Sequence, residues 1–220
     1  MAVVPLPDGR TLLATGGADG SVRLWDPTSG TAVAEPSTAH TGGVLSVAVV
    51  PLPDGGTLLA SGGGDGTVRL WEPASGSSVG DPLAGHTSRV LSVAAVPLHG
   101  RTLLATGRDD GTVRLWDPTS RTAVGVPLAG DTGTVCAVAV VPLPDGRTLL
   151  ATGSRDETVR LWDIASRALV LTIPIDAQVN SLVSVAAGLL AVGLSDGVVV
   201  LDLHNVPTGP EPSTTSQTRV

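Results

Sequence analysis

Apolar runs of strand length recur along the chain and are separated by short polar turns. In one typical stretch, the run VLSVAVV (Val44–Val50) is followed by turn residues at Pro53–Gly55 and by a second run, TLLAS (Thr57–Ser61). An Asp-Gly pair then precedes a third run, TVRLW (Thr67–Trp71). β-Branched apolar runs bounded by Pro, Asp and Gly are typical of strands joined by hairpin turns. With no helical periodicity between them, these runs predict an all-β unit of antiparallel strands.

This unit is repeated along the chain. Near-identical copies of TLLATGGADGSVRLWDPTSG begin at Thr11, Thr57, Thr102 and Thr148. Their tryptophans stand at positions 25, 71, 116 and 162, so neighbouring copies are 46, 45 and 46 residues apart. A weaker fourth strand, such as TAVAEP at Thr31–Pro36, completes each unit. A fifth, degenerate copy of the unit covers Leu189–Leu203. The pattern predicts a four-stranded meander repeated about every 45 residues, a period typical of repeat architectures.

Polar residues recur inside the unit at fixed spacing. A hydroxyl residue precedes an aspartate by four residues, and a tryptophan follows that aspartate by six. These residues are Thr15, Asp19 and Trp25; Ser61, Asp65 and Trp71; Thr106, Asp110 and Trp116; Thr152, Asp156 and Trp162. A histidine stands ahead of two copies, at His40 and His86. The unit resembles the WD repeat, whose pattern runs Gly-His, a strand, a turn, Ser/Thr, Asp and then Trp-Asp. The resemblance covers residues 2–203 and implies a β-propeller of about five four-stranded antiparallel blades.

We expect the propeller to occupy residues 1–204. Its predicted repeats cover residues 2–36, 37–82, 83–128, 129–174 and 175–204, and the Pro/Ser/Thr-rich segment 205–220 is predicted to be a disordered tail. Because the first repeat is truncated and the last lacks a fourth strand, the strand count leaves ring closure open. A compact five-bladed ring, an open arc with exposed edges, and a piece of a larger array completed by another chain all fit the sequence.

The family resemblance assigns His40, Ser61, Asp65 and Trp71 to one hydrogen-bonded chain inside a blade, and His86 to the same place in the next repeat. A buried indole N–H needs an acceptor, which the hydroxyl supplies. A Ser–His–Asp set could also be a hydrolase triad, but an enzyme needs an exposed, unpaired hydroxyl and an oxyanion site. Because the set recurs in copy after copy, with its hydroxyl paired to Trp, the sequence favours a structural role.

Two repeats depart from the pattern at the His position. Repeat four has Asp131 there and repeat five has Asp176, each facing a second carboxylate, Asp156 or Asp196. Because two close carboxylates disfavour joint ionisation, we expect Asp131 to turn outward to water and leave its blade less tightly tied. Repeat five also has a valine and an aspartate where the hydroxyl and Trp belong, so it has lost the network.

Composition narrows the function further. The 13 Lys+Arg and 20 Asp+Glu residues give a net charge of −7, which argues against a nucleic-acid or anionic-membrane footprint. One cysteine, Cys136, excludes an internal disulfide and a cysteine-based zinc site. No phosphate loop, metal-ligand cluster or nucleophile elbow is present, so no cofactor and no metal are expected. We predict a cytoplasmic protein; the use of Arg without Lys suggests a bacterial gene.

These features predict a non-enzymatic scaffold that binds other proteins or peptides, because function in a propeller resides in variable loops. Charged residues at variable loop positions are the candidate contacts: Arg89, Arg108, Asp109 and Arg155. Plain solvated loop charge is an equally good interpretation of them. Alternatives are a sensor fragment of a multidomain bacterial signalling protein and, less well supported, an enzyme or sugar-binding propeller with its site in the central channel. An open ring would also favour self-association.

Overall fold

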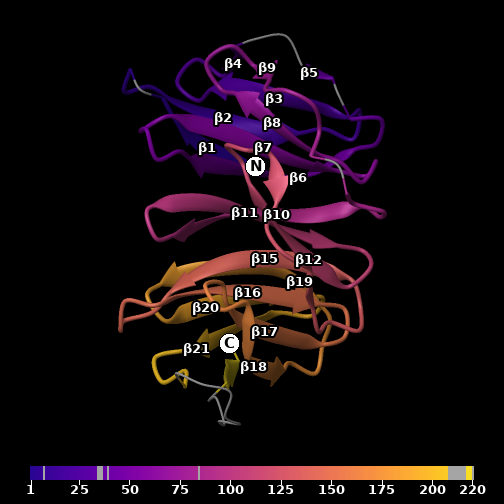
Figure 1. Cartoon of the computed structure of the whole chain (residues 1–220), viewed down its shortest axis with the longest axis vertical. Coiled ribbons are helices and arrows are strands. Elements are labelled where there is room, and N and C mark those ends of the chain that lie inside the picture. Colours follow the sequence, from indigo (N-terminus) through magenta and orange to yellow (C-terminus); the bar gives the residue numbers. More distant parts are fainter. Residues whose placement is uncertain (7, 34–36, 39, 84, 208–216, 220) are drawn as a thin grey trace. The chain divides into compact units, whose positions relative to one another are not determined.

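The computed structural model contains only strands and turns in the residues it describes, which are 1–6, 8–33, 37–38, 40–83, 85–207 and 217–219. The strands form five antiparallel sheets, one for each sequence repeat, and each sheet is a meander in chain order (Figure 1). The predicted fold class, an all-β propeller, is therefore confirmed. We call the sheets blades 1 to 5.

Blades 1 and 2 are built from the N-terminal strands. Blade 1 contains β1 (Ala2–Pro5), β2 (Thr11–Gly16), β3 (Ser21–Asp26), β4 (Thr31–Ala32) and β5 (Ser37–Thr38). Blade 2 contains β6 (Val44–Pro51), β7 (Thr57–Gly63), β8 (Val68–Glu72) and β9 (Ser77–Ser78). In blade 2 a Pro-Asp-Gly turn joins the first two strands, and Gly55 takes a positive φ there that its lack of a Cβ permits.

The other three blades repeat this order. Blade 3 contains β10 (Val90–Leu98), β11 (Arg101–Arg108), β12 (Thr112–Asp117), β13 (Thr122–Ala123) and β14 (Leu128–Ala129). Blade 4 contains β15 (Val135–Pro142), β16 (Thr148–Ser154), β17 (Thr158–Asp163) and β18 (Ala168–Pro174). Blade 5 contains β19 (Val179–Ala186), β20 (Leu189–Leu194), β21 (Val198–Asp202) and β22 (Gln217–Arg219).

The fourth strand is interrupted in blades 1 and 3. In each, two short segments pair with the third strand, β4 and β5 with β3 and β13 and β14 with β12. The predicted strand Thr31–Pro36 is therefore a strand only at Thr31–Ala32, and residues 34–36 lie outside the described residues. Because the second segment resumes the pairing, these blades extend one or two residues past the predicted repeat boundaries at 36 and 128.

The predicted disordered tail does not hold for the residues the structure describes. Val206 is buried, and the guanidinium of Arg147 donates to the carbonyl oxygens of Val206 and Pro207 at 2.7 and 3.0 Å. Farther on, β22 pairs antiparallel with β21 and supplies blade 5 with its fourth strand. The composition of this segment hid the pairing; residues 208–216 and 220 lie outside the described residues.

Two compact units make up the chain. One comprises Met1–Thr106 with Arg114–Val126, and the other comprises Gly107–Val113 with Pro127–Val220. In the first unit, Trp71 and Leu59 of blade 2 pack with Leu12 and Leu24 of blade 1. In the second, blade 5 packs on blade 4 through a shared core that includes Leu190 and Leu161. Each core is a layer of apolar side chains between two sheets, which is the usual way sheets bury their apolar faces.

Candidate functional site

A polar network crosses blade 2 from strand to strand. Trp71 on β8 donates from its indole nitrogen to Oγ of Ser61 on β7 at 2.8 Å. Nε2 of His40, on the connection before β6, lies 2.8 Å from the same oxygen, and its Nδ1 lies 3.0 Å from Oδ1 of Asp65. All four residues that the sequence assigns to this chain are therefore brought together. The network ties the incoming connection to two strands and to their turn.

Room for this network depends on Gly63, two residues before Asp65. A Cβ at Gly63 would lie 2.2 Å from Nδ1 of His40 and 2.6 Å from the Asp65 carboxylate. The absence of a side chain therefore lets the imidazole reach the carboxylate. This requirement was not recognised in the sequence, although the repeats carry Gly17, Gly63, Arg108 and Ser154 at this position.

The carboxylate of Asp65 is held in its charged form. Burial acts to raise its pKa, but hydrogen bonds from His40, from the Thr67 side chain and from the backbone N–H groups of Thr67 and Thr41 outweigh that effect. The pKa of Asp65 falls to about 2. Hydrogen bonds to a carboxylate favour its ionised form, so Asp65 anchors both the turn that carries it and the connection after His40.

This geometry does not suit nucleophilic catalysis. Ser61 is fully buried, and its oxygen already accepts the indole N–H. A serine nucleophile needs an exposed oxygen within reach of a substrate carbonyl and of oxyanion donors. The buried hydroxyl of Ser61 instead satisfies the polar groups of Trp71 and His40, so the arrangement supports a structural role for this Ser–His–Asp set.

Blade 3 contains the same hydroxyl–indole contact with a different arrangement at the turn. Trp116 donates to Oγ1 of Thr106 at 3.1 Å, and Nε2 of His86 lies 3.1 Å from that oxygen. The carboxylate of Asp110 accepts from Thr112 and forms an ion pair with Arg108 at 2.6 Å. Arg108 stands where blade 2 has Gly63, so an arginine side chain fills the place that Gly63 leaves open.

Blade 1 presents the motif near the surface. Trp25 donates to Oγ1 of Thr15 at 2.8 Å and is only half-buried. Asp19 accepts from the hydroxyl of Ser21 at 2.6 Å and pairs with Arg23 at 2.7 Å. Hydrogen bonds from Ser21 lower the pKa of Asp19, and the Arg23 charge adds to that effect. The residues thus hold the hairpin turn together at an exposed position.

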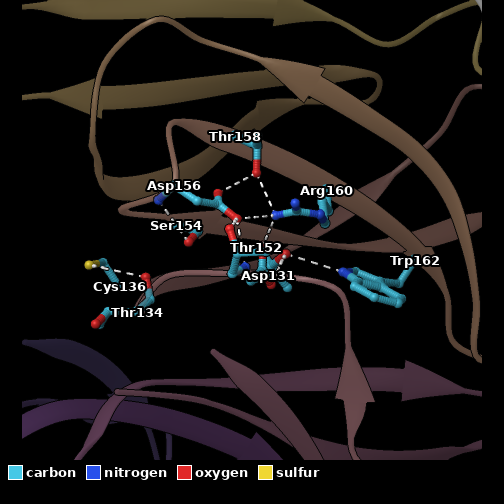
Figure 2. Close-up of polar contacts among 10 residues, drawn as sticks. Asp131, Thr134, Cys136, Thr152, Ser154, Asp156, Thr158, Arg160 and Trp162 are labelled. Carbon is cyan, nitrogen blue, oxygen red and sulfur yellow. Dashed lines mark hydrogen bonds and ion pairs between the residues drawn. The ribbon is translucent and has the colours of Figure 1, made fainter. Parts of the chain in front are cut away.

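Blade 4 overturns the expectation that Asp131 faces water. The Asp131 side chain is buried, with 2% of its surface exposed, and its carboxylate forms an ion pair with the guanidinium of Arg160 (Figure 2). The same guanidinium nitrogen lies 2.9 Å from Oδ2 of Asp156. Thr152 donates to Asp131 at 3.3 Å and accepts from Trp162 at 3.2 Å. A charged arginine between the two carboxylates removes the repulsion that predicted the outward turn.

The two carboxylates of blade 4 respond differently to this environment. Burial raises the pKa of Asp131, against the attraction of Arg160. Burial also acts on Asp156, but hydrogen bonds from Thr158, from the backbone of Thr132 and from Arg160 lower its pKa below the ordinary value. Asp156 is therefore the more readily ionised of the two carboxyl groups, and burial disfavours the ionised form of Asp131.

Close approach of the tryptophan also depends on glycine. A Cβ on Gly130, the residue before Asp131, would lie 2.9 Å from the Trp162 ring. Gly85 precedes His86 in the same way and has a φ of +132°, with the Trp116 ring 3.4 Å from its Cβ position. The close approach of the Trp162 ring therefore favours glycine at position 130, whereas at position 85 the positive φ favours glycine.

Blade 5 lacks the network and has changed its register. Val192 stands where the other blades have a hydroxyl, and Asp202, at the Trp position, lies 2.5 Å from Nδ1 of His204. In blade 2, Gly62 pairs with Val68 across the hairpin, whereas in blade 5 Gly193 pairs with Val198 and the turn is one residue shorter. A shift of one residue turns every side chain of a strand to its other face. Val199 and Leu201 therefore point into the core shared with blade 4.

The predicted partner-binding residues occupy different environments. Arg89 and Arg155 are exposed, and the backbone N–H of Arg155 donates to Thr134 at 3.0 Å. Asp109 is half-buried and accepts from the Thr134 hydroxyl at 3.2 Å. Arg108 is buried, with 2% of its surface exposed, so its prediction as a contact residue is wrong. Its ion pair with Asp110 occupies the guanidinium.

The isolated chemistry-bearing residues lie apart from these networks. Cys136 on β15 is half-buried, with its sulfur 3.7 Å from the carbonyl oxygen of Thr134. His99 lies exposed in the turn after β10 with a positive φ. Within the described part of the chain, no group of three His, Cys, Asp or Glu side chains is arranged to hold a metal ion. In the same residues, no helix is long and apolar enough to cross a membrane.

Five repeated meanders, four with the hydroxyl–indole contact, place the protein in the β-propeller class. A family model described as "WD domain, G-beta repeat" matches residues 1–26, 34–72, 77–117 and 123–163. These segments cover more than half of the chain, so the chain belongs to the WD-repeat family. Blade 5 lies beyond the matched segments, in agreement with its lost network. A search of curated proteins finds no match for the chain.

Proposed function

We propose that the protein is a non-enzymatic scaffold whose loops bind other proteins or peptides. Proteins of the WD-repeat family generally mediate such interactions. The observation that carries the proposal is the contrast between fixed turns and variable side chains on them. Aspartates at 65, 110 and 156 hold their turns in nearly the same way, whereas the residue just before each of them differs: Gly64, Asp109 and Arg155.

Rigid loops with variable side chains suit recognition because less conformational entropy is lost on binding. The turn that carries Arg155 illustrates this, since its backbone donates to Thr134 while the Arg155 side chain remains exposed. Arg89, on the connection before β10, is a second exposed arginine. Arginine is among the residues that contribute most to protein interfaces. The cytoplasmic location stays a prediction from the sequence.

The test is selection of binding peptides from a random phage-displayed library, with the full chain as bait. Selected peptides are then measured by calorimetry against wild type, Arg89→Ala and Arg155→Ala. Loss of a contacting arginine should weaken binding by about tenfold or more, which corresponds to about 1.4 kcal/mol. The matched control is Arg101→Ala. Arg101 is exposed and is the first residue of β11, so it lies at the opposite end of that strand from the turn before β12.

The proposal predicts that Arg101→Ala binds as wild type does. If Arg89→Ala and Arg155→Ala bound the selected peptides as tightly as Arg101→Ala does, the choice of these loops would be contradicted. Failure of the library to yield any specific binder would contradict it as well. Circular dichroism of each variant shows whether the fold is intact, which we expect because all three side chains lie on the surface.

A further inference from the structure

The blades inside each unit pack by one repeated rule. Across blade 2, the strand register places Val49, Leu59, Trp71 and Ser78 in one row on one face of the sheet. Leu59 and Trp71 of this row pack with blade 1. The tryptophan face of a blade therefore packs on the preceding blade. Trp116 of blade 3 follows the rule, since it shares a core with Ala60 and Leu70 of blade 2.

The surface that receives a tryptophan face is equally regular. In blade 1 it includes the row Ala2, Ala14 and Leu24, all of which belong to the core that contains Trp71. In blade 2 it includes the row Ala48, Ala60 and Leu70, which belongs to the core that contains Trp116. An alanine on the second strand lies at the centre of each row. A small central residue leaves space for the bulky indole, as complementary packing requires.

Blade 1 carries a tryptophan face that remains open to solvent. Val3, Leu13, Trp25 and Ala32 form its row, in the same register as the buried row of blade 2. Val3 is 60% exposed, and Trp25 and Leu13 are half-buried. In blade 2 the corresponding Trp71 is 2% exposed. We call the row of four residues in blade 1 the Trp25 face.

Blade 5 carries an open receiving face. Val183, Ala191 and Val200 form a row across β19, β20 and β21, with alanine again at the centre, and Val198 lies beside it on the same face. Val183 and Val198 are 57% and 48% exposed. The shortened hairpin of blade 5 turns Val198 and Val200 toward this face. We call these four residues the blade-5 outer face.

We propose that the Trp25 face of one copy of this chain packs on the blade-5 outer face of a second copy. The two surfaces match because they repeat, row for row, the pair of surfaces that the chain already packs together between blades 1 and 2. The interface is heterologous, since two different surfaces meet. An assembly of any length keeps one free Trp25 face at one end and one free blade-5 outer face at the other. Copies therefore add head to tail.

Sedimentation velocity of the full chain across a wide range of concentrations tests the assembly. The expected result is a sedimentation coefficient that rises with concentration. Val3→Asp places a charge in the Trp25 face, and Val183→Asp places one in the blade-5 outer face. Each variant alone should remain monomeric, because each has lost one of the two complementary surfaces.

A mixture of the two variants distinguishes this interface from other modes of association. The Val3→Asp copy keeps a blade-5 outer face and the Val183→Asp copy keeps a Trp25 face, so an equimolar mixture should form a dimer and nothing larger. The matched control is Val126→Asp, since Val126 is 70% exposed and belongs to neither face. That variant should associate as wild type does.

Three results would overturn the proposal: a wild-type chain that stays monomeric at all concentrations, single variants that still associate, or a mixture that stays monomeric. Thermal melts confirm that each variant is folded. If an aspartate variant does not fold, Val3→Lys and Val183→Lys repeat the test with the opposite charge at the same exposed positions.

Discussion

Replacement of an imidazole by a carboxylate at position 131 changes the role of the neighbouring arginine. The four arginines of the VRLW segments occupy the same strand position. From the sequence they could form a basic stripe for an acidic partner, but their recurrence in register with the strand favours pairing with neighbouring acids on blade surfaces. Arg23 does so, since it pairs with Asp19 at the surface. In blade 4, Arg160 is instead buried between Asp131 and Asp156. Arg160 thus links the residue at the His position to the turn aspartate in blade 4. In blade 2, the imidazole of His40 itself contacts the turn aspartate, Asp65.

Removal of that charge should be costly. Arg160→Met keeps much of the side-chain volume but leaves Asp131 and Asp156 buried without their cation. Breaking a buried ion pair by removal of one partner costs about 3–5 kcal/mol, and we expect a loss of that size in the free energy of unfolding measured with urea. Arg23→Met is the matched control, and it should change stability little because its ion pair is solvent-exposed. Equal effects would show that Arg160 has no special electrostatic role.

The pH dependence of stability should report the ionisation of Asp131. Because burial raises the pKa of Asp131 in the folded protein, the native state holds this proton more tightly than the unfolded chain does. The stabilisation from this group is therefore complete below the unfolded pKa, about 3.9, and is lost as the pH rises through the folded pKa. Asp131→Asn removes the titration.

Urea unfolding of wild type and Asp131→Asn at a series of pH values measures this effect. The wild type should lose stability relative to the variant as the pH rises above about 4. A difference between the two proteins that is constant with pH would show that the pKa of Asp131 is the same in the folded and unfolded states.

At the scale of the element, the tryptophan on the third strand links a blade to the one before it. Trp71→Ala removes an indole that is 2% exposed and leaves Ser61 without its donor. Large-to-small substitutions of buried aromatic residues cost about 3–5 kcal/mol. Trp25→Ala removes the same side chain from a half-buried position, so its loss should be clearly smaller. Chemical denaturation of both variants checks the order, and comparable losses would contradict the assignment of Trp71 to the core between two blades.

The elements themselves could be predicted because the sequence repeats. Four copies of the same strands and turns, with fixed spacing from Thr15 to Trp25 and its equivalents, define the first three strands of a blade. The fourth strand could not be predicted as well, because its short segments carry few apolar residues and depend on pairing with the third strand. The strand Gln217–Arg219 is the clearest example, since only its partner β21 identifies it.

The candidate site was harder to predict than the fold, because it depends on side-chain direction. The spacing from Ser61 to Asp65 to Trp71 was sufficient to anticipate their hydrogen bonds. No residue pattern indicated that the Arg160 side chain would turn inward to Asp131. Burial of Arg108 had a visible signal, because the corresponding residues in other repeats are the small Gly63 and Ser154. A large side chain at a position that is otherwise small must occupy space that a neighbour has left open.

At the scale of the whole molecule, charge and apolar surface act against each other. Each copy carries a net charge of −7, so two copies repel one another when their exposed apolar faces approach. Added salt screens this repulsion, and the screening length falls from about 30 Å at 0.01 M to about 10 Å at 0.1 M ionic strength. Burial of valine and tryptophan surface does not depend on that screening.

Association of the chain should therefore strengthen with salt. An interface held by ion pairs would respond in the opposite way, because salt weakens attraction between unlike charges. Sedimentation velocity at a fixed protein concentration should show the average mass rising as sodium chloride increases from about 10 mM to about 300 mM. The Val3→Asp variant should show no rise, because its Trp25 face is blocked. A mass that falls with salt would mean that charged loops, and not the faces of blades 1 and 5, hold the copies together.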